Sequence, residues 1–518
     1  MAEATLKEEH AHWSESLARR VVAEKKQPFI ITSGMTTSGP CHLGTLCEFM
    51  FPSAVQKGVV ALGHKAKFIF VADILDAFDS VPSVFQKYSA MLEPHLGKPL
   101  CDVPDPTGEQ RSFGDHFLHE AAAIMGKFSI KPEIIRAADL YASGAFDEMA
   151  SDFLGHEKQI AEMVARTSLR EGMPADWSPI MPICQKCGKI ATTTVTWHDS
   201  KSYKYSCNRD VKYTKGCGFE GENKLSDHKY KLTWRLHWPA WMRHFGTSAE
   251  GAGMDHHTRG GSWDTCKEVF EAYWKAQAPI SYKFGFILFN GKKYSKSKGI
   301  GMGVSELLEL LPTEVLSYLL LRPDLQENID IVPTGANMLR LMDDYSSALS
   351  IFENASAQEG GLEALSRADR KRAIAASLSS PNKRKWTAGF TDVLLYFQLY
   401  RNWDTVSEKL GDKAGVEYLK PHALAWVAKG MVPGEYSFEL SFSKLEEGPA
   451  RKFVESLSDT DDPVAIHNKV FETAKAEGAE AKTLFAKLYL SLLGKEKGPK
   501  LGKLVYAIGV DKVKKEVL

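Results

Sequence analysis

Residues 29 to 71 carry a strand, a helix and a second strand in close succession, and this order restricts the fold more than any other feature of the chain. The apolar run 29–32 predicts a buried strand, residues 43 to 62 have the length and pattern of a helix, and residues 67 to 71 predict another strand. Strand, helix and strand in this order form a βαβ unit. The sequence therefore predicts an α/β domain.

The turn between the first strand and the helix has the composition of a phosphate-binding loop. It reads TTSGPCHLGTL from residue 37 to residue 47, with Ser38, Gly39 and Pro40 before the helix and His42 and Gly44 at its start. The first turn of a helix attracts anions because its backbone N–H groups lack partners. His42 could donate to a phosphate, and Gly44 leaves room for adenine. Taken alone, these residues could equally form a glycine-rich turn with a capping histidine.

A lysine-rich loop, GKKYSKSKG, begins at Gly291 and follows the run 284–289, which predicts a strand. Its ammonium groups could wrap a polyphosphate, although an isolated basic loop is more often simply solvated. A P-loop is excluded, because no Gly-Lys pair of the chain is followed by Ser or Thr. A dinucleotide site is not expected either, because no G-x-G-x-x-G follows the first strand.

Four of the eight cysteines have spacings typical of a zinc site in an insert from about residue 177 to residue 224. Thiolates bind Zn²⁺ tetrahedrally, and a small insert rich in turns is stabilised by such a site. The proposed ligands are Cys184, Cys187, Cys207 and Cys217. Because the second pair is unusually widely spaced, His198 is a possible substitute, and four unrelated buried cysteines are the alternative. The remaining cysteines near the motifs are expected to pack as small apolar side chains: Cys41, Cys47 and Cys266.

Composition excludes several classes of protein. The chain of 518 residues is 44% hydrophobic and 25% charged, with 65 basic and 65 acidic residues, so net charge indicates no partner. No apolar run reaches the roughly 18 residues of a membrane helix, and the polar N-terminus lacks the apolar stretch of a secretory signal. Together with the cysteine usage, this predicts a cytoplasmic protein that does not bind membranes.

The two loops together resemble the signature pair of the class I aminoacyl-tRNA synthetases. His42-Leu43-Gly44-Thr45 stands where that family has HIGH, and Lys293-Tyr294-Ser295-Lys296-Ser297 stands where it has KMSKS. Further segments resemble the class I lysyl-tRNA synthetases, in the order and at the spacing of that family. They are DILDAFDSVP (73–82), LGKPLCDVPDP (96–106), WRLHWPA (234–240), GMDHHTRGGSWDT (253–265), IDI (329–331) and LLGKEKGPKLG (492–502). The resemblance covers nearly the whole chain.

The resemblance implies a Rossmann-like α/β catalytic domain with a zinc-ribbon-like insert, followed by an all-α anticodon-binding domain. The expected boundaries are 1–175 and 231–338 for the two halves of the catalytic domain, 176–230 for the insert and 339–518 for the helical domain. It implies ATP-dependent attachment of lysine to tRNA-Lys through a lysyl-adenylate, by a chain that we expect to be a monomer.

The resemblance also assigns roles around ATP. His42 and Thr45 would hold the α-phosphate, and Gly39 and Gly44 would lie beside the nucleotide. The residues of the second loop would hold the leaving pyrophosphate, together with Mg²⁺: Lys293, Ser295, Lys296 and Ser297. No covalent enzyme intermediate is needed, so positioning and charge stabilisation would carry the catalysis.

The amino-acid pocket departs from the family pattern. His237 stands where the family commonly has Asp, Phe284-Gly285 where it has Tyr and an acid, and Met254 where it has Lys. A lysine side chain needs an anionic partner when it leaves water, and Asp73, Asp76 or Asp255 would have to supply it. The other residues at family positions around the amino acid are Gly34, Thr36, Trp234 and His256.

These departures leave alternatives open. One is a paralogue that adenylates another amino acid or passes the acyl group to a different acceptor. Another is a catalytically inactive RNA-binding protein, against which the presence of both ATP motifs argues.

The helical C-terminal part offers two features for RNA. Residues 494–518 hold seven lysines against three acids, which could contact phosphates or form a solvated helix face. A group of aromatic residues could stack on anticodon bases, although a place in the helix core is the more frequent one: Trp386, Tyr396, Phe397, Tyr400 and Trp403.

Overall fold

The structure is a computed structural model that describes residues 11–293, 301–380 and 384–518. The chain divides into two compact units. The first comprises residues 1–305, 317–331 and 355–381, and the second comprises residues 306–316, 332–354 and 382–518.

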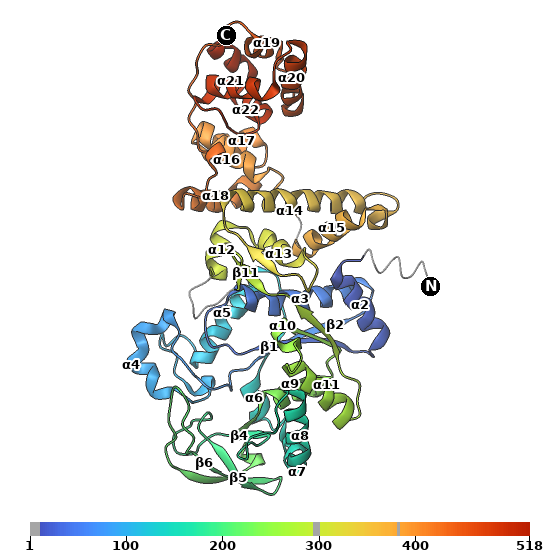
Figure 1. Ribbon diagram of the computed structural model, residues 1–518, viewed down its shortest axis with the longest axis vertical. Coiled ribbons are helices and arrows are strands. Elements are labelled where there is room, and N and C mark those ends of the chain that lie inside the picture. The colour runs from blue at the N-terminus through green and yellow to red at the C-terminus, as the bar shows by residue number, and fades with distance from the viewer. Residues whose placement is uncertain (1–10, 294–300, 381–383) are drawn as a thin grey trace. The chain divides into compact units, whose positions relative to one another are not determined.

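A five-stranded parallel sheet forms the centre of the first unit (Figure 1). Its strands, in spatial order, are β10 (Ile280–Phe284), β9 (Ala249–Gly253), β1 (Phe29–Met35), β2 (Ala66–Ala72) and β3 (Glu133–Arg136). The chain moves outward from β1 to β3 and then returns to place β9 and β10 on the other side of β1. This reversal makes a crevice at the carboxyl ends of β1 and β9, where open α/β sheets bind ligands.

Helices cover both faces of the sheet, which explains why β1 and β2 are continuous apolar runs. On one face lies α3 (Leu43–Ala61), where Ser33 of β1 donates a hydrogen bond to Glu48 at 2.9 Å. On the other lies α9 (Trp234–Phe245), whose indoles reach Glu250 of β9. The helix α2 (Trp13–Glu24) packs closely on α3, because a Cβ atom at Gly58 would come within 2.8 Å of the Cβ atom of Ala18.

The strand predicted over residues 284–289 is wrong as a single element. The chain leaves the central sheet after β10 and enters a second sheet through β11 (Ile287–Phe289), which pairs with β12 (Lys292–Lys293) and β13 (Ile329–Ile331). The break falls at Gly285, whose N–H donates to the carbonyl of Leu325 at 2.8 Å. A Cβ atom at Gly285 would lie 2.2 Å from the carbonyl oxygen of Glu327, so the crossing strand requires glycine here.

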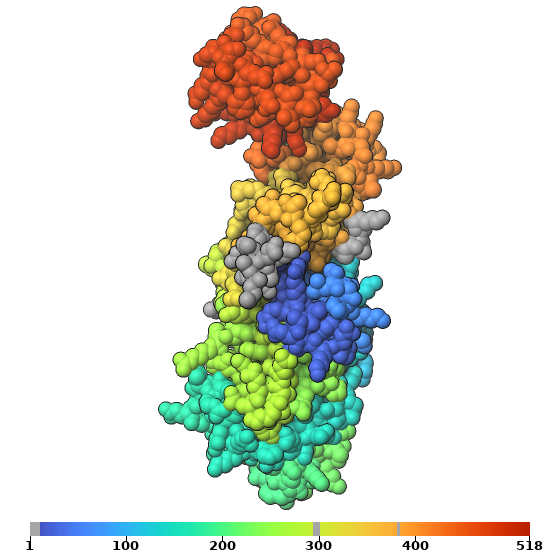
Figure 2. All heavy atoms as spheres, turned by 90° about the vertical axis from the view of Figure 1, so that its right-hand side faces the viewer, coloured from blue at the N-terminus to red at the C-terminus, as the bar shows by residue number. Residues whose placement is uncertain are grey.

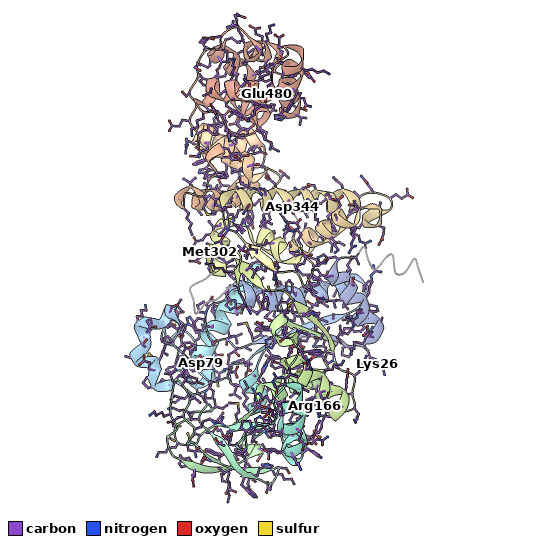
Figure 3. All side chains as sticks on the ribbon, viewed as in Figure 1. Lys26, Asp79, Arg166, Met302, Asp344 and Glu480 are labelled. Carbon is purple, nitrogen blue, oxygen red and sulfur yellow. The ribbon has the colours of Figure 1, made fainter. Side chains whose placement is uncertain are left out.

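The other elements of the first unit are short helices and a small antiparallel region. The ion pair of Arg166 on α8, labelled in Figure 3, with Glu268 on α11 (2.5 Å) links two of these helices. The helices are α4 (Ser89–Leu92), α5 (Phe113–Lys127), α6 (Ala137–Ala142), α7 (Asp147–Gly155), α8 (Glu157–Thr167), α10 (Met254–His257), α11 (Ser262–Glu268) and α15 (Arg367–Ser379). The strands are β4 (Ile180–Pro182) paired with β8 (Tyr230–Leu232), and the sheet β5 (Thr194–His198), β6 (Ser202–Ser206) and β7 (Glu220–Lys224).

The second unit is helical, and its last helices pack into a rounded body (Figure 2). Residues of α12 (Val304–Leu310) and α13 (Thr313–Leu321) are divided between the two units. The other helices are α14 (Gly335–Ser356), α16 (Phe390–Tyr400), α17 (Trp403–Leu410), α18 (Lys413–Ala428), α19 (Pro449–Ser456), α20 (Pro463–Ala476), α21 (Ala481–Leu493), α22 (Leu501–Ile508) and α23 (Val510–Val517). No helix among the described residues is long and apolar enough to cross a lipid bilayer.

Candidate functional site

The site lies at the carboxyl ends of β1, β2 and β9, where three segments distant in the sequence meet. β1 and β2 run in register up to Met35 and Ala72, so Thr36 and Asp73 leave the sheet side by side. β9, on the other side of β1, ends at Gly253 and leads into Asp255 and His256. Most of the predicted site residues that the structure describes follow these three strands.

His42 caps the helix that follows β1. Its Nδ1 atom accepts the backbone N–H of Thr45 at 3.1 Å, and the hydroxyl of Thr45 accepts the N–H of His42 at 3.5 Å. Because Nδ1 is an acceptor, the neutral ring carries its proton on Nε2, which is the atom that can donate to an anion. A Cβ atom at Gly44 would lie 3.0 Å from this ring, so the imidazole lies close over the glycine. Gly39 is half-buried in the loop before the cap.

Lys293 lies next to the residues that follow β9. Its ammonium group pairs with the carboxylate of Asp255 at 2.9 Å and lies 3.9 Å from the centre of the Phe286 ring. Both members of the ion pair are more than half exposed, so solvent screens their attraction. The start of the lysine-rich loop is thus brought to the end of β9. Ser295, Lys296 and Ser297 lie outside the described residues.

The two acids predicted to bind a substrate ammonium group already pair with an ammonium group of the chain. Lys231 of β8 contacts Asp73 at 2.7 Å and also contacts Asp76. The side chains of Lys231 and Asp73 are almost completely buried, whereas 38% of the Asp76 side chain is exposed. Thr36 donates to Asp76 at 2.5 Å. Burial alone would lower the pKa of Lys231, but the two carboxylates outweigh it and raise the pKa, so the residue is a cation.

His237, at the position where an acid was expected, is buried beside this group. The hydroxyl oxygen of Tyr141 accepts the N–H of Leu232 and forms a hydrogen bond with Nδ1 of His237, both at 2.9 Å. The other ring nitrogen, Nε2, lies 3.6 Å from Asp73 and has no hydrogen-bond partner among the described residues. Burial, reinforced by the charge of Lys231, holds the pKa of His237 well below its usual range, so the ring is neutral.

Aromatic side chains form a wall around the same pocket. Trp234 and His256 both form a hydrogen bond with the hydroxyl group of Ser262. The indole nitrogen of Trp234 lies 3.1 Å from the hydroxyl oxygen, and Nδ1 of His256 lies 3.2 Å from it. Trp234 stacks on Trp238 with ring centroids 5.5 Å apart. Gly34 gives the space for this wall, because a Cβ atom there would lie 3.1 Å from the ring of Trp241.

Three residues that fix the pocket from behind were not predicted from the sequence: Tyr141, Lys231 and Glu250. Lys231 stands between the apolar residues Tyr230 and Leu232 in a three-residue strand that is buried throughout. An isolated lysine in such a run was the signal that could have found it. Phe284, at another departure from the family pattern, packs against Phe51 with ring centroids 5.0 Å apart.

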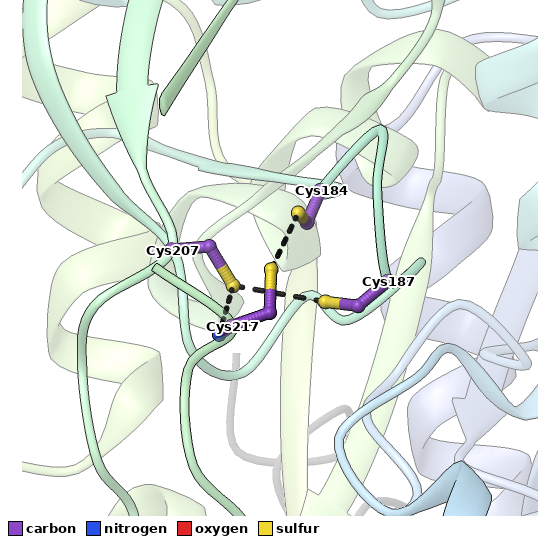
Figure 4. Close-up of side chains that lie close together, drawn as sticks. All are labelled: Cys184, Cys187, Cys207 and Cys217. Carbon is purple, nitrogen blue, oxygen red and sulfur yellow. Dashed lines mark hydrogen bonds between the residues drawn. The ribbon is translucent and has the colours of Figure 1, made fainter. Parts of the chain in front are cut away.

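The four cysteines of the insert come together, although the first and the last are 33 positions apart in the sequence (Figure 4). Their sulfur atoms all lie within 4.8 Å of one another, and the pairs Cys184–Cys217 and Cys187–Cys207 are each 3.7 Å apart. A tetrahedral zinc site with Zn–S bonds of ~2.3 Å has sulfur atoms about 3.8 Å apart, so the arrangement fits Zn²⁺. Burial raises the pKa of Cys217, but backbone and thiol hydrogen bonds outweigh it and lower the pKa to about 7.

His198 is not part of this cluster, which corrects its suggested role as a substitute ligand. Its Nε2 atom pairs with Glu157 of α8 at 3.0 Å. The wide spacing of the second cysteine pair is accommodated because residues 208–216 form a loop closed by a bridge between Val211 and Thr214. None of the eight cysteines, each of which lies within the described residues, forms a disulfide bond.

The aromatic residues considered for anticodon bases are mostly part of the helix core of the second unit. Trp386 and Tyr396 are buried, and the hydroxyl of Tyr400 donates to the carbonyl of Ala507 at 2.8 Å. Phe397 and Trp403 are half-buried and stack on each other with ring centroids 4.3 Å apart. Their apolar faces are thus already covered in part by one another.

Comparison with known proteins identifies relatives along almost the entire chain. The family model of the "tRNA synthetases class I (K)" matches residues 11–370. A "Lysine--tRNA ligase" of Thermoplasma volcanium is 28% identical and covers 96% of this chain and 97% of its own length. One of Archaeoglobus fulgidus is 27% identical over 98% of this chain and 99% of its own length. A solved glutamate tRNA ligase from Elizabethkingia meningosepticum matches with a TM-score of 0.36 and 12% identity, over 95% of this chain and 98% of that chain.

Proposed function

This chain belongs to the class I tRNA synthetases (K), and from this premise we propose that it is a lysine–tRNA ligase. It would join lysine to tRNA-Lys and convert ATP to AMP and pyrophosphate. The observation that carries the proposal is the match to lysine–tRNA ligases over almost the full length of both chains. The catalytic sheet supports it, because its carboxyl edge gathers the residues that an adenylating enzyme needs.

In the first step, the carboxylate of lysine would attack the α-phosphorus of ATP, and the bond to pyrophosphate would break. The Nε2–H group of His42 would donate to a phosphate oxygen at the start of α3, and the helix N-terminus would add its positive field. Lys293 would exchange Asp255 for the leaving pyrophosphate, with Lys296, Ser295 and Ser297 as further contacts proposed from the sequence alone. Mg²⁺ would neutralise part of the triphosphate charge. Positioning and fixed charges supply the rate acceleration of such a step.

The amino acid would lie between the ends of β1 and β9. Thr36 and Asp76 would line one side of it, and Trp234 and His256 the other. In the second step, a ribose hydroxyl of the terminal tRNA adenosine would attack the carbonyl carbon of lysyl-adenylate and release AMP. The helical second unit would bind the anticodon part of the tRNA. The reaction would take place in the cytoplasm, where cysteines that form no disulfide bonds remain reduced.

The cysteine cluster would hold a structural zinc ion. Cys184, Cys187, Cys207 and Cys217 would be its four ligands, and no ligand position would remain for water, which is the pattern of a structural site. The ion would hold the loops around β5, β6 and β7 together. Metal analysis of protein purified without chelator should find about one zinc per chain, and Cys184→Ser should lower that content; zinc-free protein of normal stability would contradict the assignment.

A pyrophosphate-exchange panel over the amino acids, with and without tRNA, tests the proposed function. We expect exchange with lysine and little exchange with other amino acids. Exchange with a different amino acid only would identify an enzyme of altered substrate, and the absence of exchange with every amino acid, tRNA included, would identify an inactive RNA-binding protein. Asp79→Asn is a suitable control variant, because Asp79 (labelled in Figure 3) is an exposed acid of the same loop as Asp76.

A further inference from the structure

The buried ammonium group of Lys231 contacts two acids that follow the same strand and that differ in their exposure to solvent. Asp73 and Asp76 both leave the carboxyl end of β2, and the Nζ atom of Lys231 contacts both carboxylates. The exposed fraction of the side chain is 1% for Asp73 and 38% for Asp76. Only one of the two acids is therefore open to a ligand.

The group retains one negative charge after this pairing. It contains two carboxylates and one ammonium group, and the neighbouring His237 is neutral. One oxygen of Asp73, Oδ1, is buried and has no hydrogen-bond partner among the described residues, so no ligand atom reaches it from solvent. Asp76 is the acid of the pair that a ligand can reach, because 38% of its side chain is exposed, and its second oxygen is oriented by Thr36.

We propose that Lys231 determines specificity as a resident counter-ion: it neutralises Asp73 and leaves Asp76 as the one acid at the end of β2 that contacts an ammonium group of the amino-acid substrate. This inference rests on the proposed function and assigns separate roles to two acids that the sequence treats alike. Asp73 positions Lys231, Lys231 cancels one charge, and Asp76 faces the substrate. Without Lys231, a substrate of one positive charge would meet two carboxylates, one of them buried and uncompensated, which is costly.

The chemistry fits either ammonium group of lysine. A carboxylate oxygen accepts hydrogen bonds from an α-ammonium and from a side-chain ammonium in the same way. Norleucine separates the two, because it has the lysine backbone and carbon chain without the terminal ammonium group.

Two double variants of equal charge test the division of roles. Lys231→Met with Asp73→Asn leaves Asp76 as the remaining carboxylate, and Lys231→Met with Asp76→Asn leaves Asp73. In pyrophosphate exchange, we expect the KM for lysine of the second double variant to exceed that of the first by at least about tenfold, with similar KM values for ATP. If the two acids had only a structural role, the KM for lysine would change equally in both double variants. Equal KM values for lysine would therefore overturn the proposal.

Norleucine then identifies the ammonium group. If Asp76 contacts the side-chain ammonium, its loss lowers the preference for lysine over norleucine; if it contacts the α-ammonium, both amino acids lose equally. Lys229→Met and Asp79→Asn are matched controls, since both side chains are exposed near the same segments. Neither control should change the KM for lysine.

Folding and function are separated by two further measurements. Urea unfolding shows whether each double variant is folded; if a double is not, Asp76→Asn alone keeps the buried pair of Lys231 and Asp73 and should still raise the KM for lysine about tenfold. An unchanged KM in that variant would overturn the proposal. Failure of the wild-type chain to exchange with lysine would instead reject the proposed function.

Discussion

At the scale of single residues, a buried carboxyl group organises the wall of the amino-acid pocket. Glu250 of β9 accepts hydrogen bonds from the indole nitrogens of Trp238 at 2.6 Å and Trp241 at 3.1 Å, and also from Thr32. Burial outweighs these hydrogen bonds and raises the pKa of Glu250 to about 7. The orientation of two tryptophans therefore depends on a group that titrates near neutral pH.

The raised pKa of Glu250 predicts in which direction the stability of the protein changes with pH. Because the folded-state pKa of Glu250 lies above that of the unfolded chain, the protonated form of this residue stabilises the folded state. This contribution to the free energy of unfolding is complete below about pH 4.5 and is lost as the pH rises to about 7. The loss should be on the order of 3 kcal/mol in the free energy of unfolding. Urea unfolding between pH 5 and pH 8 should show this fall in the wild type and a smaller one in Glu250→Gln. Parallel pH profiles of the two proteins would contradict it.

Residue types at the site were more predictable from sequence than their partners. His42, Gly44 and Lys293 stood out because their chemistry suits a polyphosphate, and the structure brings His42 and Lys293 to neighbouring strand ends. Lys231 did not stand out, because a lysine is normally solvated and its two carboxylate partners lie more than 150 positions away in the chain. Long-range pairs of this kind require knowledge of how the insert closes back on the sheet.

At the scale of elements, the N-cap residue of the helix that follows β1 has two roles that can be tested separately. His42 caps α3 through Nδ1, and its Nε2–H group, which the cap does not use, is the donor proposed for phosphate. Asparagine is among the best N-cap residues, so its Oδ1 atom can replace Nδ1 of His42 in the cap. Its side chain is shorter than that of histidine and does not reach the position of the Nε2–H group.

His42→Asn should therefore keep the fold and lose activity. We expect the free energy of unfolding to change by less than about 0.5 kcal/mol, whereas His42→Ala should cost about 1 kcal/mol. In both variants, exchange activity should fall on the order of 10²–10³-fold. Urea unfolding and pyrophosphate exchange measure the two effects; a stable Asn variant of normal activity would remove His42 from the chemistry.

Elements with a strong periodic pattern were predicted well. The strand at 29–32, the helix at 43–62 and the strand at 67–71 correspond to β1, α3 and β2 with small shifts at their ends. The four-residue strand β3 was not among the predicted elements. β3 is an edge strand whose residues are exposed or half-buried, so it lacks the apolar run that marks the central strands. The break at Gly285 was missed because it depends on contacts with residues 325 and 327.

At the scale of the whole molecule, the formal net charge is zero, but residues 494–518 have a local excess of lysine. Several lysines of residues 494–518 serve the fold: Lys503 pairs with Asp392 at 2.6 Å, and Lys514 donates to the carbonyl of Leu457 at 2.7 Å. Lys497 and Lys500 are exposed. The charges available to an RNA are therefore fewer than the seven lysines that the sequence counts.

Replacing Lys497 and Lys500 together by alanine should weaken tRNA binding and its salt dependence. Each lost phosphate contact should reduce the slope of log affinity against log salt by about 0.7–0.9. Binding titrations at several salt concentrations measure this, with Lys503→Ala as the control whose charge is already paired. An unchanged slope in the double variant would mean that this segment does not contact tRNA.

The position of β1 between β2 and β9 has a consequence for how the protein is made. β1 and β2 leave the ribosome early, but the neighbour on the other side of β1 begins only at residue 249. At about 5–20 residues per second, tens of seconds pass in which one backbone edge of β1 has no partner strand. Nascent chains of this architecture thus carry an unprotected edge until residue 249 has been synthesised, and a chaperone that shields it would act before then.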